Sequence, residues 1–416
     1  DQITGELPMS MSGIDTQYEN TGMNARYGMA HATEIDGFRA ALPDRHAPGL
    51  KIREGEAKGK VAWWATAKLY EMPDSTHVKR ILETDKVPLR YLDFDENPQA
   101  INPPSGYVYS ANNQPDSISI GLYPGYYLPE NRAKRIVQLL EPKNDWDREA
   151  VSEMINDATS AVDPLVVKDL SKALDIKELD SVQIEILDHL NAWDGNYTLE
   201  SVDAVVYTRW VYFFLYNVFH DELGEAYFKQ FLATHFQKRL IAPMAHKETS
   251  VWFDDITTKG QTETKQDIVS QSFNETLQSL TDDFGGNMED WTWDKVHTLE
   301  MEHPIGKVKA LRSFFNVGPF PVVGSREVIN NLAFVYDGTG YYKVSSGPST
   351  RRVIDFSDVE NSISILPTGQ SGNPFSPFYK DQSPLYIKGQ FRKMLMNKDT
   401  IQSSKSTLLR FTPQSD

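Results

Sequence analysis

Two adjacent asparagines, Asn112 and Asn113, stand where the stretch YVYSANNQPD changes from strand-forming residues to a breaker. A side-chain amide is a neutral hydrogen-bond donor, and a donor held rigidly at the end of a strand suits a developing oxyanion. The same pair can instead form a turn in which an asparagine side chain bonds to nearby backbone. The residues alone leave both interpretations open.

A second candidate for chemistry is Arg132, which follows Asn112 by twenty residues on a predicted helix face shared with Ile136 and Leu139. A guanidinium on an apolar helix face usually extends its charge to water or pairs with a carboxylate. It can also supply a positive charge beside a reactive group. This residue therefore becomes a site candidate only if other residues support it.

Three further patterns suggest chemistry that the sequence does not complete. His297, Glu300 and His303 could offer metal ligands, but their spacing is not that of a His-Glu-x-x-His helix and Pro304 ends the segment, so we expect structural roles and no metal in this chain. The triplet 283–285 reads Asp-Phe-Gly without the other kinase loops. No Gly-x-Ser-x-Gly turn occurs, which argues against an α/β-hydrolase.

Charge and composition exclude several classes of protein. The chain of 416 residues carries 42 Lys and Arg against 58 Asp and Glu, a net charge of −16 that opposes nucleic-acid binding. There is no cysteine, hence no disulfide or thiol nucleophile. The longest apolar run, at 210–219, has about half of the roughly 20 residues that a membrane span needs, so we expect a buried helix and no membrane span.

The order of the predicted elements indicates an α+β fold. A helix is expected over 24–41, a buried strand over 60–70, a loop over 72–106 and a strand beginning at Tyr107. Almost no strand pattern occurs between 129 and 285, where we predict helices at LPEN and over 146–158, 163–175, 179–192, 202–219, 224–239 and 264–282.

Short strands return toward the end of the chain. Asp337 to Gly340 predicts a hairpin turn, and strands fit 351–356 and 361–366. We therefore divide the chain into residues 1–128, a mainly helical region 129–285 and a β-rich part 286–416. Strands from both ends are expected to meet in one sheet system.

Several stretches together resemble the penicillin amidase family of N-terminal nucleophile hydrolases. They cover most of the chain from about residue 24 to 395 in the order of the family. The stretches are PPSGYVYSANNQP, LPENRAKRIVQLL, WTWDKVHTLEMEHPIG, FFNVGPFPVVGSREVINN, GPSTRRVIDFSD and LPTGQSGNPFSPFYKDQ.

The resemblance implies a four-layer αββα sandwich, in part, with the helical region beside it. It implies hydrolysis of the amide bond between a hydrophobic acyl group and an amine, as in penicillin G or N-acyl homoserine lactones. Members of the family are exported precursors that cleave themselves to expose a serine at the start of the large chain, so the resemblance implies a periplasmic or secreted protein. The α-amino group of that serine serves as its base.

Carried onto this sequence, the resemblance makes Asn112 the side-chain oxyanion donor and Asn113 a support. Arg132 matches an arginine that lies near the nucleophile. The partners implied are a small-molecule amide substrate and an upstream part of the precursor, consisting of the small chain and the start of the large chain with its serine.

Three departures from the family limit what this chain can do alone. Its first residues, DQITGELPMS, provide neither the nucleophilic serine nor a signal pattern, so we expect the C-terminal part of a large chain, inactive by itself. Calcium, which many members bind, is expected at most in the complete protein, because SISIGLYPGYY lacks the acidic ligand of the family. Phe378 replaces a common histidine, with no consequence that we can assign.

Two rival interpretations remain open. One is a non-catalytic scaffold or binding domain that keeps an acylase-like fold without a nucleophile. The other is an unrelated carbohydrate-binding protein, suggested by 8 Trp and 19 Tyr, although a large core also needs such aromatics. The presence or absence of an upstream chain that begins with serine distinguishes the first rival from an acylase.

Overall fold

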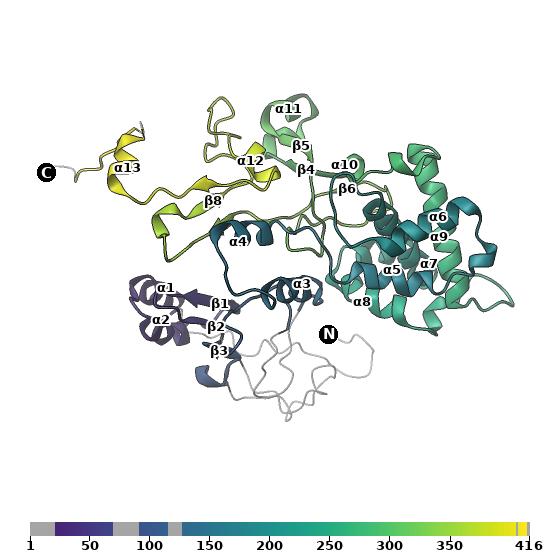
Figure 1. The fold of residues 1–416 in the computed structure, drawn as a ribbon, viewed down its shortest axis with the longest axis horizontal. Coiled ribbons are helices and arrows are strands. Elements are labelled where there is room, and N and C mark those ends of the chain that lie inside the picture. The colour runs from purple at the N-terminus through teal and green to yellow at the C-terminus, as the bar shows by residue number, and fades with distance from the viewer. Residues whose placement is uncertain (1–20, 70–90, 115–126, 405–406, 414–416) are drawn as a thin grey trace, which may run out of the picture. The chain divides into compact units, whose positions relative to one another are not determined.

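The computed structural model describes residues 21–69, 91–114, 127–404 and 407–413. The chain separates into two compact units, Asp1–Tyr127 and Leu128–Asp416 (Figure 1). Each unit is described by itself below. The division into three parts stays a prediction.

The first unit is a small helix-and-sheet body. Its elements are α1 (Gly22–His31), α2 (Ile35–Ala41), β1 (Leu50–Gly55), β2 (Val61–Thr66) and β3 (Gln99–Ile101). The strands form an antiparallel sheet in the order β1-β2-β3. Its central strand, β2, lies within the strand predicted over 60–70 and buries alternate residues. Trp64 is completely buried against Ile35 and Leu42, which fixes the helices on one face of the sheet.

Three expectations for this unit need correction. The single helix over 24–41 is two helices, because Ala32 and Glu34 adopt extended backbone between them. The expected loop over 72–106 contains β3, which pairs with β2, while its residues 72–90 lie outside the described residues. No strand begins at Tyr107, because residues 107–114 follow an irregular path.

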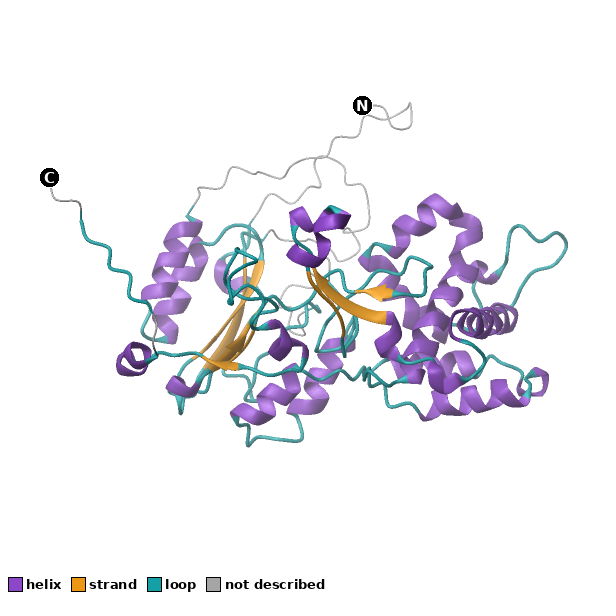
Figure 2. Cartoon of the chain, turned by 90° about the horizontal axis from the view of Figure 1, so that it is seen from above, coloured by secondary structure: helices purple, strands orange, loops and turns teal. Residues whose placement is uncertain are grey.

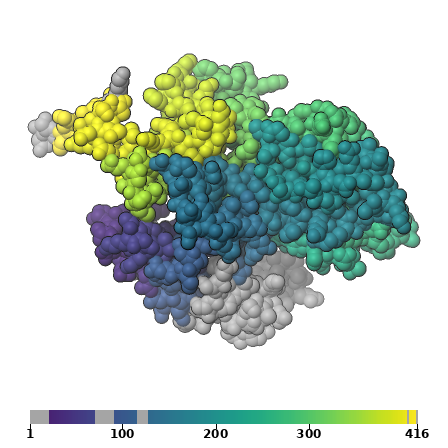
Figure 3. Space-filling model, in the orientation of Figure 1, coloured from purple at the N-terminus to yellow at the C-terminus, as the bar shows by residue number. Residues whose placement is uncertain are grey.

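The second unit contains most of the helices. These are α3 (Asn131–Leu140), α4 (Arg148–Ile155), α5 (Asp163–Ser171), α6 (Ser181–Ala192), α7 (Val202–Leu232), α8 (His235–His246), α9 (Lys265–Phe284), α10 (Trp293–Val296), α11 (Arg312–Phe315), α12 (Ser383–Ile387) and α13 (Lys398–Ser403). Helices α5 to α9 gather at one end of the unit, and the strands lie toward its other end (Figures 1 and 2). The helical end is one continuous body in the space-filling view (Figure 3).

The apolar run of 210–219 explains why α7 is the central helix of this body. Trp210, Phe214 and Val218 are completely buried, and α7 packs along α9. Buried on nearly all sides, α7 needs no amphipathic pattern. The sequence predicted that one helix ends at 219 and another begins at 224. The structure has a kink at Gly224 instead, where the φ of 64° is not helical, and α7 continues to Leu232. None of the helices in the described ranges is long and apolar enough to cross a membrane.

Side-chain caps fix where several of these helices begin. Asp180 accepts hydrogen bonds from the backbone of α6, and Gln183 bonds back to the Asp180 N–H. Thr264 and Asp267 form the same reciprocal box at the start of α9. Such boxes satisfy two otherwise unpaired N–H groups and are readable in the sequence.

The strands of the second unit form two small sheets. They are β4 (His297–Met301), β5 (Val317–Pro321), β6 (Tyr342–Lys343), β7 (Arg351–Val353), β8 (Ile363–Ile365) and β9 (Arg392–Lys393). The orders are β5-β4-β6, in which β4 and β6 are parallel, and β7-β8-β9, which is antiparallel. The strands predicted at 351–356 and 361–366 are confirmed as β7 and β8.

Each sheet among the described residues pairs strands of one unit, and the expected meeting of strands from both ends in one sheet system stays a prediction, because it would join the two units. One further expectation for the strands is wrong. The turn at 337–340 does not join a two-stranded hairpin: Tyr342 and Lys343 pair with β4, and a single bridge between Ala333 and Ser346 is all that crosses the turn.

The three residues weighed as metal ligands have structural contacts around β4. His297 is completely buried, and its Nδ1 donates to the Tyr342 carbonyl at 2.7 Å. Glu300 accepts hydrogen bonds from Arg312, and this pairing lowers the pKa of Glu300 to about 2. His303 Nδ1 accepts the Ile305 N–H at 3.1 Å. Within the described ranges no group of three His, Asp or Glu residues could hold a metal ion.

We predict that Phe273→Ala strongly destabilises the second unit. Phe273 of α9 is completely buried with its ring 4.9 Å from that of Trp210. Removing a buried aromatic side chain typically costs about 3 to 5 kcal/mol of unfolding free energy. Denaturant unfolding followed by tryptophan fluorescence measures it. Phe375→Ala, at a side chain 80% exposed, is the control and should change the unfolding free energy by about 0.5 kcal/mol or less.

We also predict that His297 stays neutral down to acidic pH, because burial lowers the pKa of His297 to about 4. The unfolded chain binds this proton first, near pH 6.5, so stability should fall as pH decreases from about 6.5 toward 4. NMR titration of the His297 imidazole measures the midpoint directly, and His297→Gln should remove this part of the pH dependence. A midpoint near 6.5 would contradict the prediction.

Candidate functional site

The asparagine pair forms a turn that divides the two amides between different tasks. Asn113 is buried, its Oδ1 accepts the Ala111 N–H at 3.2 Å and its Nδ2 donates to the Gln114 carbonyl at 3.1 Å. Asn112 occupies the left-handed region, with a φ of 60°, and is exposed. Both interpretations of the pair are therefore compatible: Asn113 holds the turn, and the turn presents Asn112 outward.

Two cationic side chains of β1 hold this turn from the sheet. Lys51 Nζ donates to the Asn113 carbonyl, and Arg53 Nη1 donates to the Ser110 carbonyl at 3.5 Å. Ala111, which lies between Ser110 and Asn113 in the sequence, is completely buried. These side-chain hydrogen bonds fix the turn to the sheet in place of regular strand pairing. A precisely placed donor requires such support. The sequence analysis missed Lys51 and Arg53, since nothing local in the sequence marks them as contacts of residues 110–113.

Arg132 lies in the first turn of α3, in the second unit. The helix is anchored one turn later, where Arg135 makes a two-pronged ion pair with Asp157 at 2.9 and 2.7 Å. Burial lowers the pKa of Arg132, and the negative charge of Glu327 acts in the opposite direction. The charge that acts on Arg132 in this way belongs to a carboxylate 195 positions later in the chain.

Glu327 belongs to a buried group of charges that the sequence analysis did not single out. Lys238 Nζ on α8 lies 2.7 Å from Glu327 Oε1, and these side chains are 11% and 9% exposed. Arg326 is 6% exposed and places its guanidinium 4.8 Å from the ring centre of Tyr336. Besides burial, the charges of Arg326 and Arg132 both lower the pKa of Lys238. We call Arg132, Lys238, Arg326 and Glu327 the charge cluster.

A second buried carboxylate continues this polar region into the helical core. Asp163, at the start of α5, accepts a hydrogen bond from the Tyr197 hydroxyl at 2.7 Å. Burial raises the pKa of Asp163, while bonds from Tyr197 and Tyr207 lower it. The charge of Glu327 also raises the pKa of Asp163. The polar groups of α5, α7 and α8 are therefore electrostatically linked to the charge cluster.

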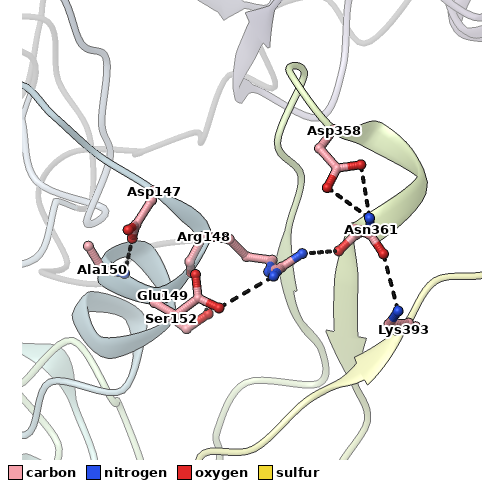
Figure 4. A network of polar contacts seen from close by, with 8 residues as sticks. All are labelled: Asp147, Arg148, Glu149, Ala150, Ser152, Asp358, Asn361 and Lys393. Atoms are coloured by element: carbon pink, nitrogen blue, oxygen red, sulfur yellow. Dashed lines mark hydrogen bonds and ion pairs between the residues drawn. The ribbon is translucent and has the colours of Figure 1, made fainter.

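A separate open groove of about 580 Å³ lies between α4 and the β7-β8-β9 sheet. Figure 4 shows Arg148 donating to the Asn361 carbonyl at 3.0 Å and Lys393 donating to the Asn361 Oδ1 at 3.2 Å. Asn361 donates in turn to Asp358 at 2.8 Å. Arg148 also pairs with Glu149 at 3.3 Å, and the lining of the groove contains no histidine to activate Ser152.

The parts that Asn112 and Arg132 would play in a hydrolytic site stay predictions. Asn112 offers a neutral donor, and Arg132 offers a positive charge. Neither is a nucleophile or a general base. Asn112 lies in the first unit and Arg132 in the second, so each role is a prediction made within its own unit. The stretch examined for a calcium carboxylate, SISIGLYPGYY, lies outside the described residues except for Tyr127.

Comparison with known proteins agrees with the sequence resemblance. Acyl-homoserine lactone acylase QuiP of Pseudomonas aeruginosa is 28% identical over 333 residues, covering 72% of this chain and 39% of that protein. The protein of the same name from Pseudomonas fluorescens (strain Pf0-1) is 24% identical, with 90% and 47% covered. Penicillin acylase 2 proenzyme of Pseudomonas sp. (strain SE83) is 23% identical, with 78% and 41% covered. The chain thus spans less than half the length of these relatives.

The fold has a solved counterpart. A thermostable penicillin G acylase from Alcaligenes faecalis matches with a TM-score of 0.62 and 17% identity, covering 96% of this chain and 74% of that one. This match confirms the α+β fold of the N-terminal nucleophile hydrolases. The family described as penicillin amidase matches residues 3–403, nearly the whole sequence. The chain belongs to the penicillin amidase family of amide-hydrolysing acylases.

Proposed function

We propose that this chain is the C-terminal part of the large chain of an acylase, which cleaves the amide bond between a hydrophobic acyl group and an amine. Substrates of the penicillin G or N-acyl homoserine lactone kind fit this class. The observation that carries the proposal is the turn at 111–114, which buries Asn113 and presents the Asn112 amide at an exposed left-handed corner. The printed names of the relatives, acyl-homoserine lactone acylase and penicillin acylase, support the substrate class.

In this proposal the nucleophile comes from sequence that this chain does not contain. A terminal serine attacks the amide carbonyl, its own α-amino group takes the hydroxyl proton, and the carbonyl oxygen becomes negative. Asn112 donates its side-chain N–H to that oxygen, and the donor stabilises the transition state because it is already oriented. The C–N bond then breaks, the amine leaves with the proton, and water releases the acyl group from the serine.

The role of Arg132 is to keep a positive charge near the nucleophile. Its pKa is lowered by burial yet remains that of a guanidinium, which stays charged at any physiological pH. A fixed cation favours the neutral, proton-accepting form of a neighbouring amine. This would make the α-amino group of the serine a usable base near neutral pH.

Several properties of the complete protein belong to the same proposal. We infer that it is exported to the periplasm or secreted, that it cleaves its own precursor and that it acts in antibiotic metabolism. The calcium of the family would be held mainly by upstream residues. The chain alone spans 39 to 47% of the length of the relatives. By itself it would lack the nucleophile and part of the substrate contacts, and it would be inactive.

The first experiment is the intact mass of every polypeptide in the denatured, purified complete protein. A second polypeptide, or a longer one, with a terminal serine supports the acylase. A single species near 47.2 kDa without that serine supports the rival interpretation, a scaffold that keeps the acylase fold. Release of the amine from an acylated chromogenic amide then tests the chemistry in the same sample.

We predict that Asn112→Ala in the complete enzyme lowers the acylation rate by about 10²- to 10³-fold, the usual effect of losing one oxyanion donor. Asn112→Gly should lower it equally, because both remove the amide. The left-handed backbone suits glycine and asparagine better than alanine, so only the Ala variant should cost about 1 kcal/mol of stability. Burst kinetics and thermal unfolding measure the two effects.

The matched control is Asn102→Ala in the same unit. Asn102 is also exposed and left-handed, with a φ of 46°, and its Oδ1 accepts the Val61 N–H at 3.1 Å. This variant should lose stability and keep its acylation rate. If the Asn112 variants acylate as fast as the wild type, Asn112 is not the oxyanion donor.

A further inference from the structure

A small lobe after β4 leaves large apolar side chains in water. It consists of two short 3-10 helices, η8 (Pro304–Lys307) and η9 (Lys309–Leu311), which pack against each other and against α11. Every third residue of the lobe is large, apolar and 40 to 55% exposed: Ile305, Val308, Leu311 and Phe314. We call these four residues the apolar patch.

An aromatic residue from a distant segment extends the patch. Phe375, which is 80% exposed, lies edge-on to Phe314 with the ring centres 4.9 Å apart. The same segment is tied to the lobe by Tyr379, whose hydroxyl donates to the Phe315 carbonyl. Figure 1 shows α11 and the chain just before α12 on the same side of the second unit. Two segments far apart in the sequence thus build one apolar surface.

Buried polar contacts beneath the patch hold it in one conformation. Glu300, whose side chain is 2% exposed, accepts hydrogen bonds from Arg312 Nε at 2.9 Å and from Asn316 Nδ2 at 3.0 Å. Asn316 Oδ1 in turn accepts the His303 N–H at 3.1 Å. Gly306 lies so close that a Cβ there would be 1.8 Å from Asn316 Oδ1. The patch is therefore preorganised, and a partner could bind it at little cost in ordering.

Cations border the patch. Lys307 and Lys309 alternate with its apolar residues along the chain, and both are exposed. Arg312 pairs with Glu300, whereas neither lysine forms an ion pair among the described residues. A segment that covers the patch would match it best with apolar side chains at the centre and carboxylates at the edge.

We propose that the apolar patch is the docking surface for the part of the precursor that precedes this chain. Monomeric proteins rarely leave a contiguous apolar surface of large size in water, and such a surface commonly marks an interaction site. The proposal rests on the proposed function only in taking an upstream part to exist.

The extent of the matches supports this choice of occupant. The chain spans 39 to 47% of the length of the relatives and 74% of the similar solved chain, so a large part of such a protein has no counterpart here. A membrane is a weaker candidate, because a net charge of −16 opposes approach to anionic lipids. The expected occupant is an apolar upstream segment flanked by Asp or Glu.

The first test places a photo-crosslinking analogue of phenylalanine at position 308 of the complete protein. Mass spectrometry of the digested product should find this position joined to a peptide from upstream of the chain. The same analogue at position 251 is the control, because Val251 is 83% exposed in another 3-10 helix, Val251–Phe253, and should give no such product. A crosslink to the first unit or to a second copy, or none at all, would overturn the proposal.

Substitutions test the same contact without a chemical probe. Val308→Glu combined with Leu311→Glu should raise the dissociation constant of the upstream polypeptide about ten- to a hundredfold, as the loss of central interface residues commonly does. Lys307→Glu should weaken the assembly in the same direction, and Val251→Glu should leave it intact. Native mass spectrometry after dilution measures the released polypeptide. Unchanged dissociation in the double variant would reject the docking surface.

These variants should keep the fold of this chain, because exposed positions contribute little to its stability. For the same reason, truncating Phe375 leaves the folding of the second unit unchanged whatever covers the patch in the complete protein. The crosslinking result does not depend on the substitutions to Glu, so the proposal stays testable if the double variant fails to assemble for another reason.

Neither readout requires amidase activity, which separates this proposal from the acylase function. The expected crosslink in a protein that has no amidase activity would keep the docking surface and reject the proposed function. An active acylase without that crosslink would do the reverse. Binding of the complete protein to vesicles of phosphatidylglycerol and phosphatidylcholine, if abolished by Val308→Glu, would assign the patch to a membrane surface and overturn the proposal.

Discussion

The second unit depends on placing a lysine–glutamate ion pair inside the protein, with both side chains almost completely buried. Taking an ion from water into a protein interior costs several kcal/mol even after relaxation, and removing one partner of a buried pair is strongly destabilising. Glu327 meets this constraint with Lys238 at 2.7 Å and with the charge of Arg132. A hydrophobic replacement for the whole cluster would serve stability as well. The presence of charged residues here therefore fits a role that requires charge.

The apolar core provides the rigidity on which the charge cluster relies. Helix α7 buries its aromatic residues against α9, and α8 packs on both α7 and α5. Lys238 is held by a helix that cannot shift without opening this core. The first unit obtains rigidity differently, since its turn at 111–114 is held by one buried amide and by two cations from β1.

Sequence reasoning succeeded where the signal is local. The apolar run of 210–219 predicted a buried helix, and the apolar and aromatic run of 60–70 predicted β2. It failed where the secondary structure of a segment depends on a partner that is distant in the sequence. Residues 342–343 pair with β4 and not across the adjacent turn, and residues 107–110 form no strand.

The same difference between local and distant signals applies to the candidate site residues. Asn112 and Arg132 were found because motifs of a known family carry them. Lys238 and Glu327 were missed because 89 positions separate them, and neither residue type nor local pattern reveals that they meet in a buried place. A buried ion pair is a property of the folded chain alone.

The backbone conformation at Asn112 restricts which amino acids can occupy this position. A φ of 60° admits glycine, asparagine and aspartate most readily, and of these only asparagine supplies a neutral donor. A single-nucleotide change to aspartate would keep the fold and replace the donor by an acceptor. A lineage could thus lose hydrolysis in one step while every contact of the turn survived. Acylase-like proteins that serve only as binding domains could arise from such a change without rebuilding any part of their structure.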